Sequence, residues 1–106
     1  MDLITRQDLV GSTPLIGLDG VVDLGSIPIL HARLRRSIDD HPGATVVVDL
    51  DGVTSLDDCG LGVLLGAAGW ARERGGDLAV VCTSARLRER LRLTGLDRAV
   101  EVRERV

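Results

Sequence analysis

The chain has 106 residues, of which 44% are apolar, and it carries a net charge of −3 with one tryptophan, no phenylalanine and no tyrosine. This length favours a single domain, residues 1–106, built around one core. Because the chain has no basic excess and only one aromatic residue for base stacking, we expect no nucleic-acid partner. Two cysteines, no basic leader followed by an apolar run, and no apolar stretch of about 20 residues predict a cytoplasmic domain that does not insert into a membrane.

The first part of the chain predicts a hairpin. Residues 14–20 alternate in character and are expected to form a strand that ends at Gly20. Residues 6–10 are expected to form a short edge strand beside it. The small and polar residues 11–13 would supply the turn between the two.

A helix is expected to follow the hairpin. Ser26 is the predicted N-cap, and Pro28 lies in the first turn, where its missing N–H is harmless. The helix is expected to stop before the sequence His-Pro-Gly at residues 41–43. Its apolar face is formed by residues at intervals of three and four, namely Ile27, Leu30, Leu34 and Ile38.

The second half of the chain continues the alternation of strands and helices. Residues 44–50 form a continuous run rich in β-branched side chains, which is typical of a central strand buried on both faces. The order predicts an α/β fold with a four- or five-stranded mixed sheet and helices packed on it. The expected later elements are a helix over 60–75, a strand over 78–82, a helix capped by Ser84 and closed by Gly95, and a short strand over 99–102.

The junction between the central strand and the second helix is the most informative stretch. It ends in two acids, Asp57 and Asp58, either of which is suited to accept hydrogen bonds from the free N–H groups of the helix. Gly60 and Gly62 leave the first turn of that helix without large side chains, so another protein could approach it closely. The plainer interpretation is that the two acids are helix caps and nothing more.

Three motifs in this order resemble the STAS domain of anti-sigma factor antagonists. Residues 49–64 are similar to the family's strand and D-S-[SA]-G-L-G loop, residues 20–23 to its upstream G-x-x-D element, and residues 91–97 to its L-x-x-x-G-L-D element. The resemblance covers about residues 14–102 and implies a STAS-like fold.

The resemblance also implies a function. Antagonists of this family bind an anti-sigma factor, often a GHKL-type serine kinase, and so free the sigma factor. They act by protein–protein contact and not as enzymes, and no cofactor is expected. The implied partner-binding residues are Asp23, Asp57, Asp58, Cys59, Gly60, Leu61 and Gly62.

The chain departs from the family at the decisive position. The phosphoacceptor serine of the family falls on Asp58, which has no hydroxyl to phosphorylate. Either Asp58 fixes the domain in a phosphorylated-like state, or the partner accepts an acidic loop. Thr54 and Ser55 are the nearest hydroxyls, but they precede Asp57 and do not match the acceptor position.

Other interpretations remain open at this point. The domain could be the STAS subunit of an ABC-type lipid transport complex, or a redox sensor that uses Cys59 and Cys82. An acidic pair after a strand is also typical of a Mg²⁺ or phosphoacceptor site, but the receiver type requires a lysine and the chain has none. The arginines at 86, 88, 90 and 92 are expected to form a solvated helix face.

Overall fold

The computed structural model describes residues 2–106, and its strands form one five-stranded sheet in the order β1-β2-β3-β4-β5. β1 runs antiparallel to β2, and the remaining neighbours are parallel. The predicted α/β fold with a mixed sheet is therefore confirmed. The elements are β1 (Ile4–Val10), β2 (Thr13–Val22), η1 (Leu24–Ser26), α1 (Ile27–Asp40), β3 (Thr45–Leu56), α2 (Asp58–Glu73), β4 (Asp77–Val81), α3 (Ala85–Thr94), α4 (Leu96–Ala99) and β5 (Glu101–Arg103).

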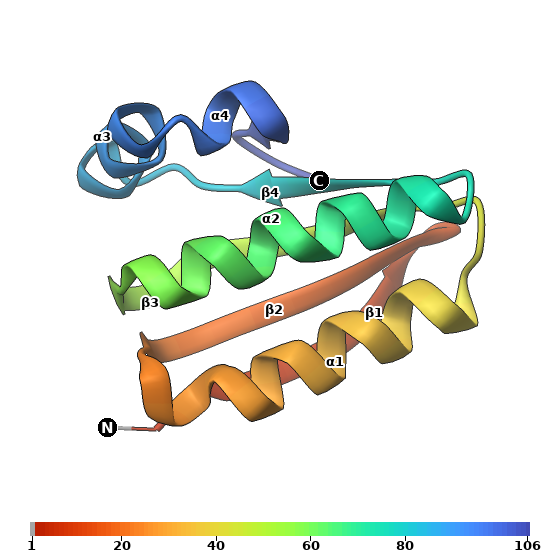
Figure 1. The fold of residues 1–106 in the computed structure, drawn as a ribbon, viewed down its shortest axis with the longest axis horizontal. Coiled ribbons are helices and arrows are strands. Elements are labelled where there is room, and N and C mark those ends of the chain that lie inside the picture. Colours follow the sequence, from red (N-terminus) through yellow and green to blue (C-terminus); the bar gives the residue numbers. More distant parts are fainter. Residues whose placement is uncertain (1) are drawn as a thin grey trace.

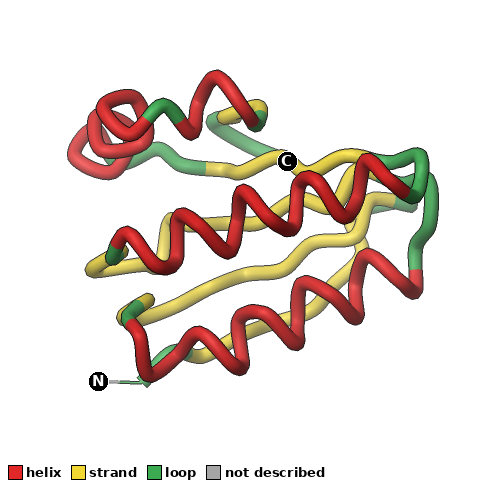
Figure 2. The backbone as a smooth tube through the Cα atoms, viewed as in Figure 1, coloured by secondary structure: helices red, strands yellow, loops and turns green. Residues whose placement is uncertain are grey.

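The core lies between the sheet and the long helices. α1 and α2 run side by side across one face of the sheet, while α3 and α4 lie on the β4 side of the molecule (Figures 1 and 2). Val48 of β3 pairs with Ile16 of β2 and with Val80 of β4, and all three side chains are fully buried. Val47 faces the opposite side of the sheet and is also fully buried. The central strand is thus buried on both faces, as its β-branched run predicts.

The first helix confirms its predicted face but corrects its predicted cap. Leu30, Leu34 and Ile38 are at most 2% exposed. The Ser26 side chain makes no capping hydrogen bond to α1. Asp23 caps the short helix η1 instead: its Oδ1 accepts from the N–H of Ser26 at 3.1 Å, and the Ser26 hydroxyl accepts from the N–H of Asp23 at 3.0 Å. This reciprocal pair adds a turn before α1.

The third strand is longer than its sequence predicts. It continues to Leu56, where residues after Leu50 were expected to turn. The extension pairs with the second half of β2, through Gly52 beside Asp19 and Leu56 beside Val22, after shifts in register. The helix α2 accordingly begins at Asp58 and not at residue 60.

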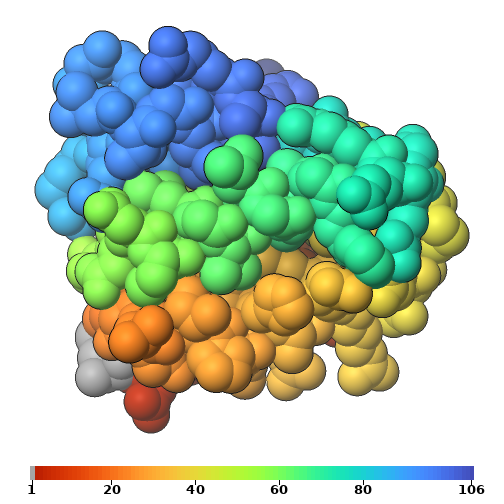
Figure 3. All heavy atoms as spheres, in the orientation of Figure 1, coloured from red at the N-terminus to blue at the C-terminus, as the bar shows by residue number. Residues whose placement is uncertain are grey.

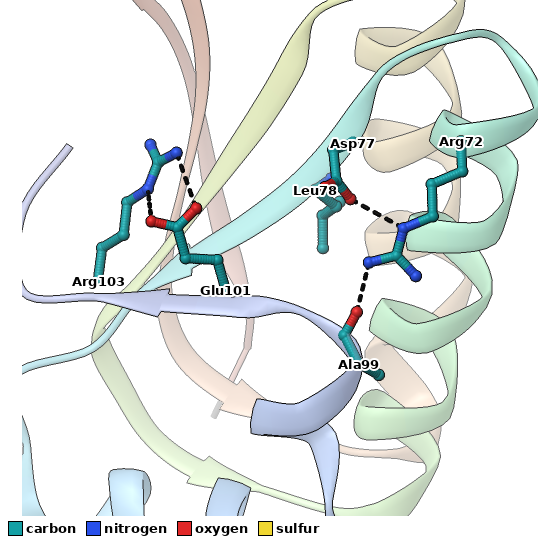
Figure 4. Close-up of polar contacts among 6 residues, drawn as sticks. All are labelled: Arg72, Asp77, Leu78, Ala99, Glu101 and Arg103. Atoms are coloured by element: carbon teal, nitrogen blue, oxygen red, sulfur yellow. Dashed lines mark hydrogen bonds and ion pairs between the residues drawn. The ribbon is translucent and has the colours of Figure 1, made fainter.

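The C-terminal elements are tied to the end of α2. The guanidinium of Arg72 donates to Asp77 at the start of β4, at 3.0 Å, and to the carbonyl of Ala99 at the end of α4 (Figure 4). The short helix α4 was not expected, and the last strand begins at Glu101, two residues later than its sequence predicts. Among residues 2–106, no helix combines the length and apolarity that a membrane crossing requires.

Candidate functional site

The end of β2 and the beginning of α2 meet at one corner of the molecule. The N–H of Asp57 donates to the carbonyl of Val22 at 2.9 Å, which brings Asp57 next to Asp23 in space. Figure 1 shows this corner at the ends of β2 and β3, where α2 starts. The acids that the sequence singles out therefore lie at the carboxyl end of the parallel strands, where binding sites are common in open α/β sheets.

The two acids at the start of α2 face solvent. Asp57 occupies the N-cap position with an extended backbone, but its side chain accepts no hydrogen bond from the helix, so the predicted side-chain cap is wrong. Its carbonyl accepts from the N–H groups of Gly60 and Leu61, as an N-cap carbonyl does. Asp57 is exposed, and the side chain of Asp58 is 87% exposed. Both carboxylates therefore remain accessible to solvent at the start of α2.

Two of the predicted contact residues are buried. Leu61 is 7% exposed and belongs to the core. Its side chain is therefore not exposed for a partner, whereas the family resemblance implied a partner-binding residue. Gly60 is also buried, and a Cβ added there would lie 2.4 Å from Cγ1 of Val22. The first turn of α2 lies too close to β2 for a side chain at Gly60. This glycine therefore permits close packing of α2 on β2 within the chain.

The opposite side of the same turn is open. Gly62 is exposed, and a Cβ added there would meet no atom of residues 2–106 within 4 Å. Cys59 is half-buried and lines, with Gly62, a groove between α1 and α2. We define the docking corner as the accessible members of the predicted set: Asp23, Asp57, Asp58, Cys59 and Gly62.

Trp70 of α2 also lines the groove and is partly buried. Its indole N–H donates to Asp39 of α1 at 3.0 Å. The guanidinium carbons of Arg35 and Arg74 lie 3.6 Å and 3.5 Å from the centroid of its ring. These contacts join α1 to the C-terminal half of α2.

The arginines of α3 form the predicted solvated face only in part, because Arg86 and Arg92 are exposed while Arg88 and Arg90 are half-buried. Arg86 donates to the carbonyl of Thr54 at 2.9 Å, and Arg88 donates to the carbonyl of Cys82 at 2.8 Å. Arg90 forms an ion pair with Asp58, with 2.6 Å between Nη2 and Oδ1. Figure 3 shows the C-terminal helices on the same face of the molecule as the start of α2, and the long side chains of Arg86 and Arg90 reach from α3 to Thr54 and Asp58.

Two further acids of β3 hold the loop after β4. Asp51 accepts from both the N–H and the hydroxyl of Thr83, at 2.7 Å and 3.0 Å. Asp49 accepts from the N–H of Asp51 at 2.9 Å. These carboxylates position the chain that leads into α3, and hence position Arg90 beside Asp58.

The two cysteines lie in different surroundings and both are free thiols. Cys82 is fully buried in the core, and its S–H donates to the carbonyl of Ser84 at 3.8 Å. Burial raises the pKa of the Cys82 thiol, and the negative charge of Asp51 raises it further. A buried thiol that keeps its proton is a poor nucleophile, which counts against a redox pair of Cys59 with Cys82.

The sequence pattern also missed features of this corner. Leu24 is 77% exposed directly after Asp23, and Ile29 is 40% exposed nearby on α1. Asp23 and Ile29 line the same shallow pocket. Leu24 is an apolar residue between the predicted strand that ends at Gly20 and the helix predicted to start at Ser26. That position could have indicated an exposed apolar side chain. Within residues 2–106, no three His, Cys, Asp or Glu side chains come together in a way that would hold a metal ion.

Comparisons with known proteins place this arrangement in a known class. The fold, a five-stranded mixed sheet with helices on one face, is that of an anti-sigma factor antagonist from Mycobacterium paratuberculosis, with a TM-score of 0.88, 24% identity, and coverage of 99% of this chain and 88% of that one. The anti-sigma factor antagonist SpoIIAA in its unphosphorylated form matches with a TM-score of 0.74 and 16% identity, over 97% of this chain and 90% of that one. The phosphorylated form of the Bacillus cell fate determinant SpoIIAA matches with a TM-score of 0.70 and 19% identity, over 93% of this chain and 90% of that one.

The sequence comparisons agree with the fold. The family model of the STAS domain matches residues 6–106, and the chain belongs to that family. The anti-sigma-B factor antagonist of Bacillus subtilis (strain 168) is 29% identical over 87 residues, which is 82% of this chain and 78% of that protein. The resemblance inferred from the three motifs is confirmed.

Proposed function

We propose that this chain is an anti-sigma factor antagonist that binds a serine-kinase-type anti-sigma factor through the docking corner and so releases a sigma factor. It acts by contact and not by catalysis, in the cytoplasm, where transcription takes place. The observation that carries the proposal is the exposed, acidic start of α2 in a chain of the STAS family, with Asp58 87% exposed and Gly62 open beside it.

The chemistry of the corner supports a docking role. Asp57 and Asp58 present exposed carboxylates, and Leu24 adds an exposed apolar side chain at the same end of the molecule. A polar rim beside an apolar contact is typical of protein interfaces. The open flank at Gly62 allows a partner's backbone to approach α2 closely.

The residue at the phosphoacceptor position distinguishes this chain from related antagonists that are regulated by phosphorylation. Asp58 stands where related antagonists have the serine that a kinase modifies, and it offers no hydroxyl. We therefore propose that phosphorylation at this position does not regulate the chain. Its binding to the anti-sigma factor would be set by abundance and by the partner's own nucleotide state.

The test is a calorimetric titration of the chain with each purified serine-kinase-type anti-sigma factor of its source genome. We expect one of them to bind. Gly62→Leu should weaken that binding by about tenfold or more, because the new side chain fills the open flank of the corner. The matched control is Gly69→Leu on the same helix, where an added Cβ also meets no atom within 4 Å.

The outcome that contradicts the proposal is equally concrete. If none of the anti-sigma factors binds and the ATPase of a lipid-transport complex does, the chain is a transport subunit. If Gly62→Leu and Gly69→Leu weaken binding equally, the partner contacts the groove as a whole and not the corner. Unfolding curves of both variants establish that each is folded.

A further inference from the structure

The exposed carboxylate of Asp58 in the docking corner forms an ion pair with an arginine. Nη2 of Arg90 lies 2.6 Å from Oδ1 of Asp58, although the two residues belong to different helices. Asp58 is the first residue of α2, and Arg90 lies in the middle of α3. The pairing exists only because the fold places α3 against the start of α2.

The side chain of Arg90 is packed against the protein along part of its length. Its Nε is buried and has no hydrogen-bond partner among the side chains and backbone of residues 2–106. The arginine side chain as a whole is 37% exposed, so its inner part is packed while its tip reaches Asp58. One turn earlier on the same helix, Arg86 fixes α3 to the carbonyl of Thr54 at 2.9 Å. The contact of Arg86 fixes the position of α3 and with it the base of the Arg90 side chain, while the tip of Arg90 has Asp58 as its ion-pair partner.

The pair changes the charge that a partner meets. A phosphoserine carries a charge of about −1.5 to −2 with three acceptor oxygens. Asp58 carries about −1, and the guanidinium of Arg90 against it brings the sum of the two charges close to zero. An ion pair this exposed adds little to the stability of the fold. Its effect is on the electrostatic surface of the corner.

We propose that Arg90 is a positioning residue of the docking corner, which holds the Asp58 carboxylate against α3 and cancels its charge, so that the partner meets a neutral ion pair. This inference rests on the proposed function and deepens it. Asp58 is then not a phosphate mimic. Position 58 then carries no net charge, as an unmodified serine would, while the exposed Asp57 keeps the corner acidic, and the chain binds its partner constitutively.

The test compares five variants in the calorimetric titration with the anti-sigma factor that binds: Arg90→Gln, Arg90→Lys, Asp58→Asn, the double variant and the control Arg92→Gln. Arg90→Gln leaves Asp58 uncompensated and should weaken binding about fivefold to tenfold, less so at high salt. Arg90→Lys keeps the charge and should recover most of the loss. The double variant Arg90→Gln with Asp58→Asn removes both charges and should bind within about twofold of the unaltered chain.

The matched control is Arg92→Gln. Arg92 lies on the same helix, pairs with Glu89 at 2.5 Å, and its replacement changes the net charge by the same amount. It should change binding by less than about twofold, because its pair lies away from the corner. A control that weakens binding as much as Arg90→Gln would show an effect of overall charge and would overturn the inference.

A second readout requires no partner. NMR of the arginine side chains should show hindered rotation of the Arg90 guanidinium in the unaltered chain and free rotation in Asp58→Asn. Free rotation in both would overturn the inference. So would tighter binding by Asp58→Asn together with no effect of Arg90→Gln, since Asp58 would then act as an uncompensated charge. If the unaltered chain binds no anti-sigma factor, the proposed function fails and the inference fails with it.

Discussion

Replacing Gly60 with alanine places a methyl group where the structure has no room for one. The added Cβ would lie 2.4 Å from Cγ1 of Val22 and 3.1 Å from Cδ1 of Leu56, whereas carbon atoms in contact lie about 3.5–4.0 Å apart. Both neighbours are core residues, with Val22 fully buried and Leu56 4% exposed. Val22 is β-branched and stiff, so the start of α2 must move away from β2.

The size of the effect follows from two opposing contributions. Overpacking a core costs about 1–3 kcal/mol. Alanine in place of glycine inside a helix gains at most about 1 kcal/mol, and less at position 60, which lies in the first turn. Gly60→Ala should therefore lower the free energy of unfolding by about 1–2 kcal/mol. For a domain of this length that is a fall in Tm of roughly 4–16 °C.

The matched control is Gly66→Ala in the same helix. A Cβ at Gly66 meets no atom of residues 2–106 within 4 Å, so only the helix-propensity gain applies. It should raise the free energy of unfolding by about 0.5–1 kcal/mol. The assay is urea unfolding followed by far-UV circular dichroism, with Trp70, the single tryptophan, as an independent fluorescence probe.

A second substitution tests the cause. Val22→Ala makes room beside residue 60, so the double variant should lose less stability than the sum of the two single variants. If Gly60→Ala is as stable as Gly66→Ala, the first turn of α2 does not pack on β2 as described, and the assignment of Gly60 to packing is wrong.

Two further predictions concern the core thiol and the tryptophan. Because burial raises the pKa of Cys82 above the ordinary 9.0, the folded state holds its proton to higher pH than the unfolded chain. Stability should therefore fall as the pH rises past about 9, and Cys82→Ala should flatten that part of a urea-unfolding series; an unchanged slope would contradict it. Trp70→Phe removes the hydrogen bond to Asp39 and should cost about 0.5–1.5 kcal/mol in the same assay, whereas no loss would show that the bond contributes nothing.

The short-range patterns of the sequence were sufficient for the main elements. The spacing of Leu30, Leu34 and Ile38 and the run at Val46–Val48 report which face of a helix or strand is apolar, and burial then follows from the hydrophobic effect. Gly95 ends α3 with a φ of +82°, a conformation that favours glycine in any fold. The STAS motifs belong to this same local level of information.

The docking corner was predictable in part. Asp23, Asp57 and Asp58 follow strand ends, and carboxyl ends of parallel strands share one edge of a sheet. The sequence pattern could not separate Gly62, which is open, from Gly60 and Leu61, which are buried. That distinction depends on the rotation of α2 about its axis, which is set by packing on β2 and not by the residues of α2 alone.

The sequence by itself determined the class of fold, the order of the strands and longer helices, and the acidic junction before α2, because each depends on residues a few positions apart. Only the tertiary structure decided that β3 continues to Leu56, since its hydrogen-bond partners lie in β2. It alone paired Arg90 with Asp58, because the approach of α3 to the start of α2 depends on how both helices pack against the same core. The local pattern of apolar and polar residues determines which elements form. Packing between segments that are distant in the sequence determines which charged residues and glycines are exposed at the docking corner.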